Sequence, residues 1–333
     1  MVFQCSKCKR KWQQPIGICP YCLIELDRIK SEKMETVVSS KVSISSLPHM
    51  KVPYFANIIK DEQGNLFAYK STEKIDKIEL KSNPESVAIF RIKYDIIEGL
   101  ENIFKLLEVS LNENLKVLVI PTLISTNYTY FKENTSPELL ESVLNFLLEK
   151  KISVKVGAQS FNEIPIEGLA QKSGLLDVCL KKGITPFDLS KAVFVKKEDL
   201  EISEEVLSAD LVINLSMLKA EKVASTDNIF YVLKKENYSG LKYLQSEKEI
   251  SEKLLKTLSN VITIGEADTV QRSNSTTTYL GLIFGGRNFL NVDAIFNKVI
   301  MARKLPEIIK DINVDSIAIS GRSIMEVERD IEM

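Results

Sequence analysis

Four cysteines near the N-terminus are the residues whose types and spacing most clearly predict chemistry. They form two Cys-x-x-Cys pairs, Cys5 with Cys8 and Cys19 with Cys22, and ten residues separate the pairs. A Cys-x-x-Cys turn directs two thiolates at one ion, so two such turns complete a tetrahedral shell of four sulfur atoms. This donor set favours zinc, with iron as the less favoured occupant. Because a four-cysteine shell leaves no open position, we expect the metal to be structural.

The composition of the same segment supports a metal-dependent fold. Lys7, Lys9, Arg10 and Lys11 offset the negative charge of the thiolates and help to keep them deprotonated. About twenty residues cannot bury a hydrophobic core, so the bound ion must supply the folding energy. We therefore predict a zinc ribbon over residues 1–26, and we expect a partner protein to dock on it. The fifth cysteine, Cys179, is predicted to be a small buried apolar side chain.

The single histidine, His49, excludes several kinds of active site. The large C-terminal part of the chain has no histidine, so it contains neither a Ser-His-Asp nor a Cys-His catalytic arrangement and no histidine-based metal site. His49 lies between two prolines in a predicted linker, where an exposed loop residue is the simplest interpretation.

The charge balance disfavours two classes of partner. Lys and Arg total 44 and Asp and Glu total 45, so nucleic-acid binding is less favoured and a polybasic membrane surface is not expected. No apolar run reaches the roughly 18 residues that a membrane-spanning helix needs, and the first residues lack the apolar segment of a signal peptide. Cysteines grouped for metal binding suit a reducing compartment, so we expect a cytoplasmic protein.

The elements that position any further chemistry are clearest between Lys116 and Ser160. KVLVIPTLI reads as a buried strand, Ser136-Pro137-Glu138 as the start of a helix, and ISVKVG as a second buried strand. Strands and helices then alternate to the C-terminus, which predicts an α/β fold with a largely parallel sheet over residues 83–333. Within it, residues 167–183 are predicted as one helix, residues 271–278 as a polar loop, and a helix is predicted to start at about Asn291.

Two segments precede this domain. Residues 27–49 are predicted as a linker, although their Ser-rich half also fits an exposed edge strand. Residues 50–82 read as a small β module, either a barrel or a packed hairpin.

Ligands of open α/β sheets bind beyond the carboxyl ends of the strands. The candidates for ligand binding there or in the later loops are Thr122, Ser125, Ser160, Lys219, Arg287 and Asp293. The candidates for catalysis are Lys219, Glu266 and Asp268. Gly285-Gly286-Arg287 fits either an anion-binding turn or an ordinary tight turn, and Asp293 or Asn291 fits the cap of the following helix.

From residue 86 to about residue 311, the chain resembles the family catalogued as domain of unknown function 362. The matching pieces, in order, are SVAIFRIKY, LKVLVIPTLIS, TSPELLESVLNFLLEKKISVKVGAQS, ADLVINLSMLKAEKVASTD, VITIGEAD and GGRNFLNVDAIFNKVI. Their order and spacing carry the resemblance, since each word alone is weakly specific. The fold also looks distantly similar to the nickel-dependent lactate racemase superfamily.

Departures from the family pattern imply a reduced catalytic apparatus. Where the family usually has Lys-Pro-Asn, this chain has Ile120-Pro121-Thr122, and where it tends to have Lys-Thr-His, this chain has Lys219-Ala220-Glu221. The Gly/Pro-rich loop expected after VITIGEAD is replaced by residues 269–278, which contain no glycine. Lys219, Glu266 or Asp268, and Asp293 survive.

Three functional hypotheses remain open. The first is a zinc-binding multi-domain protein whose ribbon and β module recruit a partner, while the α/β domain binds a ligand or partner with weak or lost catalysis. The second is an enzyme that acts on an anionic small molecule between Lys219, Arg287 and the strand-end loops, with Glu266 or Asp268 as acid or base. The third is a nucleic-acid-binding protein built on the ribbon and the β module.

Overall fold

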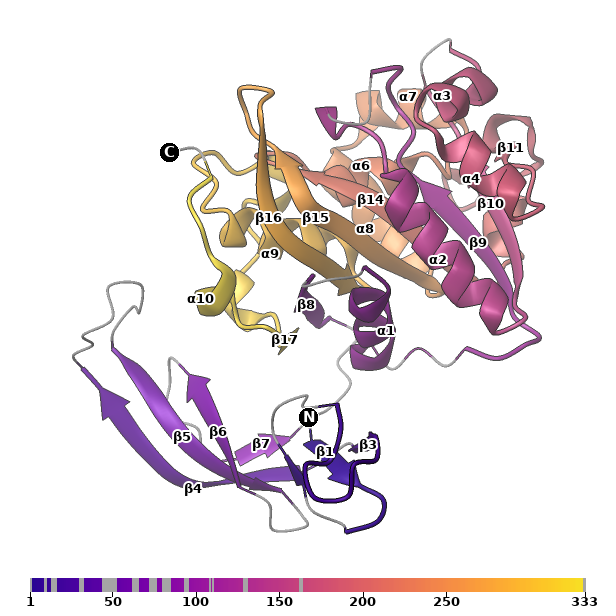
Figure 1. Cartoon of the computed structure of the whole chain (residues 1–333). Coiled ribbons are helices and arrows are strands. Elements are labelled where there is room, and N and C mark those ends of the chain that lie inside the picture. The colour runs from indigo at the N-terminus through magenta and orange to yellow at the C-terminus, as the bar shows by residue number, and fades with distance from the viewer. Residues whose placement is uncertain are drawn as a thin grey trace. The chain divides into compact units, whose positions relative to one another are not determined.

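The structure is a computed structural model, and the chain divides into two compact units, Met1–Lys81 and Ser82–Met333 (Figure 1). The described residues are 2–8, 11–12, 17–29, 33–43, 53–61, 66–71, 77–79, 85–92, 96–107, 109, 111–127, 131–161 and 164–331. His49, Lys9 and Arg10 lie outside these ranges. Within the described ranges, no helix combines the length and the apolar character needed to cross a membrane.

The described residues of the first unit form two antiparallel sheets. In one, β1 (Val2–Cys5) lies between β2 (Lys11–Trp12) and β3 (Leu26–Ile29). The other has the order β6 (Leu66–Ser71), β5 (Tyr54–Asp61), β4 (Lys33–Val42) and β7 (Lys77–Glu79).

Strand β4 corrects the linker predicted over residues 27–49. Its first residues, Lys33–Glu35, pair with β5 on one side and β7 on the other, whereas the Ser-rich residues up to Val42 pair with β5 alone. The Ser-rich half is therefore an edge strand, the alternative that its sequence also fitted, and its Val and Thr residues favour extended backbone.

The second unit contains an eight-stranded sheet in the order β11-β10-β9-β14-β15-β16-β8-β17. Its strands are β8 (Val87–Arg91), β9 (Lys116–Pro121), β10 (Ser153–Ala158), β11 (Phe187–Asp188), β14 (Leu211–Lys219), β15 (Val261–Gln271), β16 (Thr277–Gly286) and β17 (Ile319–Gly321). All neighbouring pairs are parallel except those that involve β16, which is antiparallel to β15 and to β8. The predicted α/β fold with a largely parallel sheet is therefore confirmed.

Helices cover both faces of this sheet (Figure 1). The α-helices are α1 (Ile96–Leu106), α2 (Pro137–Glu149), α3 (Ile166–Lys172), α4 (Leu175–Lys181), α5 (Glu204–Leu207), α6 (Ala224–Phe230), α7 (Lys235–Leu244), α8 (Glu247–Thr257), α9 (Phe289–Val299) and α10 (Ile324–Val327). Short 3-10 turns lie at Leu189–Lys191, Glu307–Ile309 and Val314–Ser316. A separate hairpin pairs β12 (Phe194–Lys197) with β13 (Leu200–Ser203).

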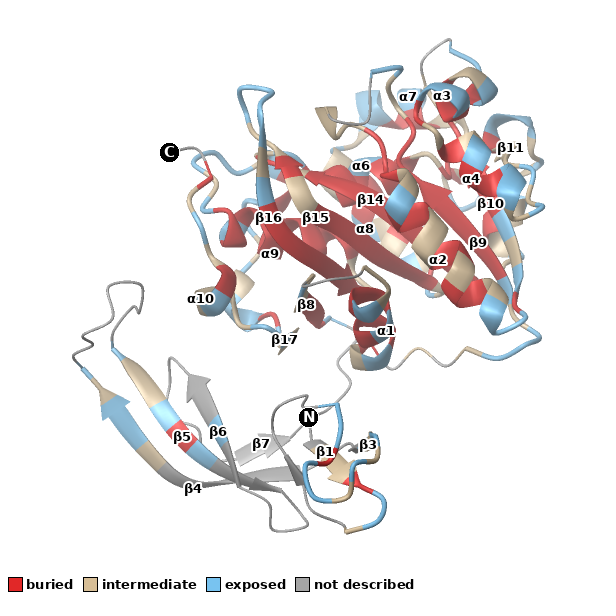
Figure 2. Cartoon of the chain, viewed as in Figure 1, coloured by how far each residue is buried: buried red, intermediate tan, exposed pale blue. Residues whose placement is uncertain are grey.

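The apolar runs of the central strands are explained by burial on both faces (Figure 2). In β9, Val117 and Val119 point into the core beneath α1 and α2, whereas Leu118 and Ile120 point into the core beneath α6 and α8. Successive side chains of a strand face opposite ways, so an uninterrupted apolar sequence is what a doubly covered strand requires.

Local signals set several boundaries as predicted, and others differently. Helix α2 starts at Pro137, and the hydroxyl of Ser136 accepts the N–H of Leu139 at 3.1 Å. The helix predicted over 167–183 is instead two helices, because Gly174 adopts a left-handed φ of 77° between them. The predicted loop 271–278 is confirmed for residues 272–276, which connect β15 to β16, whereas Gln271, Thr277 and Thr278 are paired strand residues.

Candidate metal centre and carboxyl-edge site

The four N-terminal cysteines converge on one point. Their sulfur atoms all lie within 4.8 Å of one another, and Sγ of Cys8 is 3.8 Å from Sγ of Cys19. Zn–S bonds of about 2.3 Å in a tetrahedron place sulfurs about 3.8 Å apart, so this donor set fits a zinc-sized ion. Cys5 and Cys19 are fully buried, and Cys8 and Cys22 are half-buried.

Two turns of the backbone bring the pairs together. In the first, the N–H of Cys8 donates to Sγ of Cys5 at 3.4 Å. In the second, the N–H of Cys19 donates to the carbonyl of Ile24, and the N–H of Leu23 donates to the carbonyl of Cys19, both at 2.8 Å. Burial raises the pKa of Cys5, but the N–H groups of Cys8 and Lys7 and the neighbouring thiols lower it to about 7. The first turn therefore favours the thiolate of Cys5, the form that binds metal, whereas burial and the neighbouring thiols raise the pKa of Cys22 to about 12.

Cys179 takes no part in this centre. It lies on α4 in the apolar core of the second unit, as predicted, and burial raises the pKa of its thiol to about 11.

At the carboxyl edge of the sheet, Asn134 fixes the loop that follows β9. Its Oδ1 accepts the N–H groups of Ile124 and Ser125 at 2.8 and 3.0 Å, and its Nδ2 donates to the carbonyl of Ser125 at 2.7 Å. The N–H of Thr122 donates to Oγ1 of Thr135 at 2.9 Å. The structure therefore gives Thr122, which is buried, a role in holding the loop, and Asn134 is a loop residue that sequence reasoning missed.

The same edge brings three charged side chains into one site, here called the carboxyl-edge site: Glu133, Lys219 and Asp227. Lys219 ends β14, Glu133 lies in the loop after β9, and Asp227 lies in the first turn of α6. Burial lowers the pKa of the half-buried Lys219 ammonium, and Glu133 and Asp227 oppose that shift by their charge. Glu133 and Asp227 are residues that sequence reasoning missed, and only their loop and helix-start positions signalled them.

Lys219 forms no ion pair with the residues that the structure describes. Within that part of the chain, no carboxylate oxygen lies within 4.0 Å of its Nζ, the limit for an ion pair, and no hydrogen bond engages the ammonium. Glu221, two residues on, instead accepts the backbone N–H of Lys304 at 3.2 Å. The ammonium is therefore held near two carboxylates and retains its donors for a ligand.

The two carboxylates are held differently. Oε2 of Glu133 accepts Nδ2 of Asn127 at 2.6 Å; burial raises the pKa of Glu133, but bonds from Ser125 and Asn127 and the charge of Lys219 lower it overall. The side chain of Asp227 is exposed to solvent. Desolvation by the surrounding protein and the charge of Glu247 nevertheless raise the pKa of its carboxyl group to about 6. A group both accessible and desolvated suits a site that exchanges protons or binds cations.

The remaining acidic candidates at this end of the strands, Glu266 and Asp268, form hydrogen bonds within the protein. Glu266 is 2% exposed, and its Oε2 accepts the N–H of Ser136 at 3.0 Å, so it holds the start of α2. Burial raises the pKa of Glu266. Asp268 lies two residues on, where the β15–β16 register shifts between Ala267 and Thr269. Their charges interact, since that of Asp268 adds to the rise of the Glu266 pKa.

Asp293 is fully buried on α9 but does not cap α9. Asn288 does so, because its Oδ1 accepts the N–H groups of Leu290 and Asn291. Asp293 instead accepts the N–H groups of Ser225 and Thr226 at the start of α6, at 3.0 and 2.8 Å. Burial raises its pKa to about 7, opposed by these hydrogen bonds.

Arg287 lies beyond the amino ends of the central parallel strands, whereas Lys219 lies at their carboxyl ends, so the two side chains are at opposite edges of the sheet in that sense. Arg287 follows Gly286, which pairs with Thr263 near the start of β15, whereas Lys219 pairs with Gln271 at the end of β15. The predicted cleft that combined Lys219 with Arg287 is therefore not formed. Ser160, which follows β10, lies at the same edge as Lys219 and is partly buried with contacts of its own.

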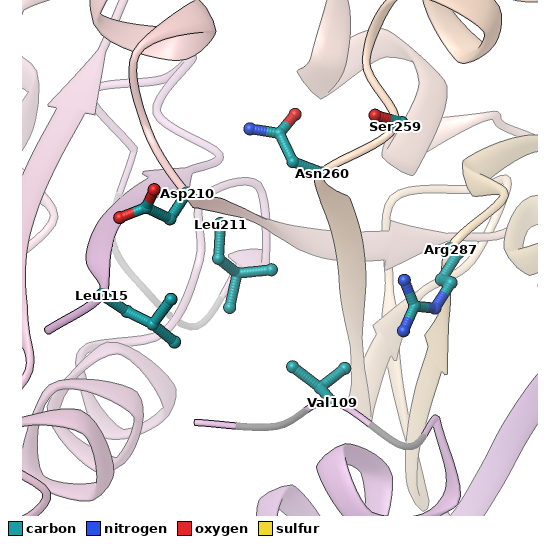
Figure 3. A pocket seen from close by; sticks show the side chains of 7 residues that line it. All are labelled: Val109, Leu115, Asp210, Leu211, Ser259, Asn260 and Arg287. Atoms are coloured by element: carbon teal, nitrogen blue, oxygen red, sulfur yellow. The ribbon is translucent and has the colours of Figure 1, made fainter. Parts of the chain in front are cut away.

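Arg287 lines a pocket of about 300 Å³ together with Val109, Leu115, Asp210, Leu211, Ser259 and Asn260 (Figure 3). Its Nη2 donates to the carbonyl of Leu107 at 3.3 Å. Oδ2 of Asp210 accepts the N–H of Lys116, and Nδ2 of Asn260 donates to the carbonyl of Ala209, so both are bound to backbone. The pocket therefore offers one guanidinium and aliphatic walls, and we place the functional site at the other edge, where unpaired charges converge.

Glycines 285 and 286 are paired residues of β16 and do not form a turn. They end β16, and a Cβ on Gly285 would lie 2.2 Å from Cγ2 of Ile103. Glycine is required there because α1 packs directly onto the strand.

One family model matches part of the chain. A search of curated proteins finds none that matches the chain. The family model described as Domain of unknown function (DUF362) matches residues 117–228, a shorter stretch than the resemblance suggested. The similarity to the lactate racemase superfamily stays a prediction. The match runs from β9 into α6 and includes Glu133, Lys219 and Asp227. Residues 117–228, which build the carboxyl-edge site, are therefore similar to the family described as Domain of unknown function (DUF362).

Proposed function

We propose that this protein is a cytoplasmic zinc-binding protein whose α/β domain binds a small polar ligand at the carboxyl-edge site, with weak or lost catalysis. On this proposal the N-terminal unit recruits a partner protein. The observation that carries the ligand site is the half-buried ammonium of Lys219, which lies near Glu133 and Asp227 without an ion pair to either. A charge kept partly desolvated and unpaired costs stability, and a ligand that pairs it recovers that cost.

Zinc is proposed for the cysteine centre because four thiolates and a 3.8 Å sulfur–sulfur distance suit a tetrahedral zinc shell. Cys5, Cys8, Cys19 and Cys22 would hold the ion, which would fix the two turns relative to each other. Iron accepts the same donors and is the less favoured occupant.

Partner recruitment is supported by apolar side chains on the second cysteine turn. Ile18, Tyr21 and Leu23 are 53%, 69% and 79% exposed. Exposed large apolar side chains that are grouped on a small module favour a protein contact. Replacement of Leu23 by Ser should abolish retention of a partner from a lysate while zinc content stays unchanged, and equal retention would contradict this role.

An enzyme is the second candidate. The lowered pKa of Lys219 and the raised pKa of Asp227 bring both groups closer to neutrality, as acid–base catalysis requires. The two carboxylates beside Lys219 and the distant position of Arg287 disfavour the anionic substrate of the original hypothesis. We propose binding as the primary function because no nucleophile with an activating base accompanies these groups among the described residues. Nucleic-acid binding is the least supported alternative.

The ligand site is tested by native mass spectrometry of the purified full-length protein and of Lys219→Met. We expect the wild-type chain to retain a small molecule, either one that co-purifies with it or one found in a metabolite screen. The Lys219→Met chain should lose this molecule. Lys219→Arg, which keeps the charge, should retain part of the binding. A ligand held equally by wild type and Lys219→Met would overturn the proposed site.

A further inference from the structure

Two aromatic side chains lie next to the carboxyl-edge site. Phe161 follows β10, Tyr231 follows α6, and their ring centroids are 4.8 Å apart in an edge-to-face arrangement. Both are half-buried, so each keeps an accessible part. We call Phe161 and Tyr231 the aromatic pair.

Helix α6 joins the aromatic pair to the charged groups. Asp227 and Tyr231 are four residues apart at its end, a spacing that places two side chains on one face. The charge of Asp227 contributes to the raised pKa of Tyr231, after burial, which agrees with that proximity.

The path of α6 across the sheet explains why the two groups meet. Nδ2 of Asn228 donates to the carbonyl of Ile120 on β9 at 3.0 Å, and Nε2 of Gln159, just after β10, donates to the carbonyl of Leu233 at 2.7 Å. The helix and the turn after it therefore run from the end of β14 toward the end of β10. Loops from three adjacent strands line one surface, which is charged at the β14 side and aromatic at the β10 side.

The charged half offers both signs. Lys219 supplies one ammonium with three donors, and Glu133 and Asp227 supply carboxylate oxygens that accept. Asn127, Ser125 and Gln271 form hydrogen bonds with the carboxylate of Glu133, whereas no hydrogen bond from the described residues engages the carboxylate of Asp227. A ligand with a single negative charge would meet two carboxylates, and one with a single positive charge would meet an unpaired lysine. A ligand that carries both charges pairs all of them.

We propose that this surface binds a small zwitterion with an aromatic or large apolar side group, an α-amino acid or a compound of the same pattern. The ligand carboxylate pairs with Lys219, its ammonium lies between Glu133 and Asp227, and its side group packs on Phe161 and Tyr231. This inference rests on the proposed ligand site and commits it to a ligand class.

Calorimetry on the full-length, zinc-loaded protein tests the class with four compounds. Phenylalanine should bind, whereas 3-phenylpropionate, which lacks the ammonium, and phenethylamine, which lacks the carboxylate, should each bind at least about tenfold more weakly. Alanine should also bind at least about tenfold more weakly, because it leaves the aromatic pair uncovered. Phenylpropionate or phenethylamine that binds as tightly as phenylalanine overturns the zwitterion, and no measurable binding of any aromatic or branched amino acid overturns the class.

Matched variants locate the binding. Lys219→Met and Asp227→Asn should each weaken phenylalanine binding by about tenfold or more. Tyr231→Leu should weaken phenylalanine more than alanine. Arg287→Met removes a cationic side chain at the other edge of the sheet and should leave the affinity unchanged. Thermal unfolding of each variant establishes that it is folded, and Lys219→Arg separates loss of charge from loss of fold.

The outcomes separate this inference from the proposal beneath it. If another class of small molecule binds in a Lys219-dependent way and amino acids do not, the zwitterion is wrong and the site stands. If amino acids bind equally to wild type and Lys219→Met, both are wrong.

Discussion

Asp293 on α9 accepts two hydrogen bonds from Thr226 on α6. Its Oδ2 lies 2.8 Å from the backbone N and 2.8 Å from Oγ1 of Thr226, and its Oδ1 accepts the N–H of Ser225. The carboxylate is fully buried and serves as the cap that the start of α6 lacks from its own sequence, because the preceding Val223 has no polar side chain. Asp293 thereby positions the helix that carries Asp227.

Replacement of Asp293 by Asn should reduce the dependence of stability on pH. Burial raises the pKa of Asp293 from 3.8 to about 7, so between these values the native state holds a proton that the unfolded chain releases. Its contribution to the free energy of unfolding is therefore largest at the acid end and is lost as pH rises through about 7. The free energy of unfolding of Asp293→Asn, measured in urea, should change less than that of wild type between about pH 5.5 and about pH 8. It should also be lower than that of wild type by about 1–3 kcal/mol.

Asp227→Asn is the control for that measurement, since Asp227 titrates at about 6 and carries no comparable hydrogen bonds. If the free energy of unfolding of Asp293→Asn depends on pH as that of wild type does, while Asp227→Asn removes this dependence, the titration belongs to Asp227.

Ligand affinity should fall below pH 6. The ammonium of the proposed zwitterion needs the ionised form of Asp227, whose pKa burial and Glu247 raise to about 6. The association constant should be level above that value and decrease by up to about tenfold per pH unit below it. Calorimetry of phenylalanine binding at several pH values measures this, with Asp227→Asn expected to be weak and nearly independent of pH. An affinity that rises on acidification would contradict this role.

Loss of one cysteine of the metal centre should unfold the N-terminal turns and leave the α/β domain folded. Elemental analysis should give one zinc for the four cysteines, and Cys5→Ser should lose most of it, because three thiolates bind far more weakly than four. Cys179→Ala should keep the full zinc content, since Cys179 lies in the α/β core. Zinc lost from both variants alike would place metal elsewhere.

Glu266 should tolerate replacement by Gln. Its Oε2 accepts the N–H of Ser136, and a glutamine carbonyl oxygen can accept the same bond, so the loss of stability should stay within about 1 kcal/mol and ligand binding should be unchanged. Glu266→Leu leaves that buried N–H without an acceptor and should cost about 1–3 kcal/mol in denaturant unfolding. A folded Glu266→Gln protein that no longer binds ligand would return Glu266 to the list of functional residues.

Gly285→Ala should destabilise the protein, and Gly240→Ala should not. A Cβ at position 285 would lie 2.2 Å from Cγ2 of Ile103, and the overpacked core should cost about 1–3 kcal/mol. Gly240 on α7 has open space around its Cβ position, so alanine there should stabilise the helix by about 0.5–1 kcal/mol. Equal unfolding midpoints for the two variants would show that the α1–β16 contact relaxes freely.

The sequence alone determined the local features. The Cys-x-x-Cys spacing indicated the metal centre, and Ser136-Pro137 marked the start of α2 because capping depends on a few adjacent residues. Apolar runs such as KVLVIP predicted buried strands, since a doubly covered strand needs apolar side chains on both faces. Strands alternating with helices predicted the largely parallel sheet. Strand β4 was less clear, because the pairing that stabilises it comes from β5 and β7.

Only the tertiary structure decided which side chains share a site. Lys219 and Arg287 looked equivalent as strand-end cations, but the antiparallel direction of β16 places Arg287 at the opposite edge. Glu133 and Asp227 act on Lys219 through their charges from a loop after β9 and from α6, and the chain carries no local pattern that links the three residues. Charge, burial and pairing depend on neighbours distant in sequence, whereas caps and strand periodicity depend on neighbours within a few residues. That difference is why the sequence predicted the elements of this protein and the tertiary structure assembled its site.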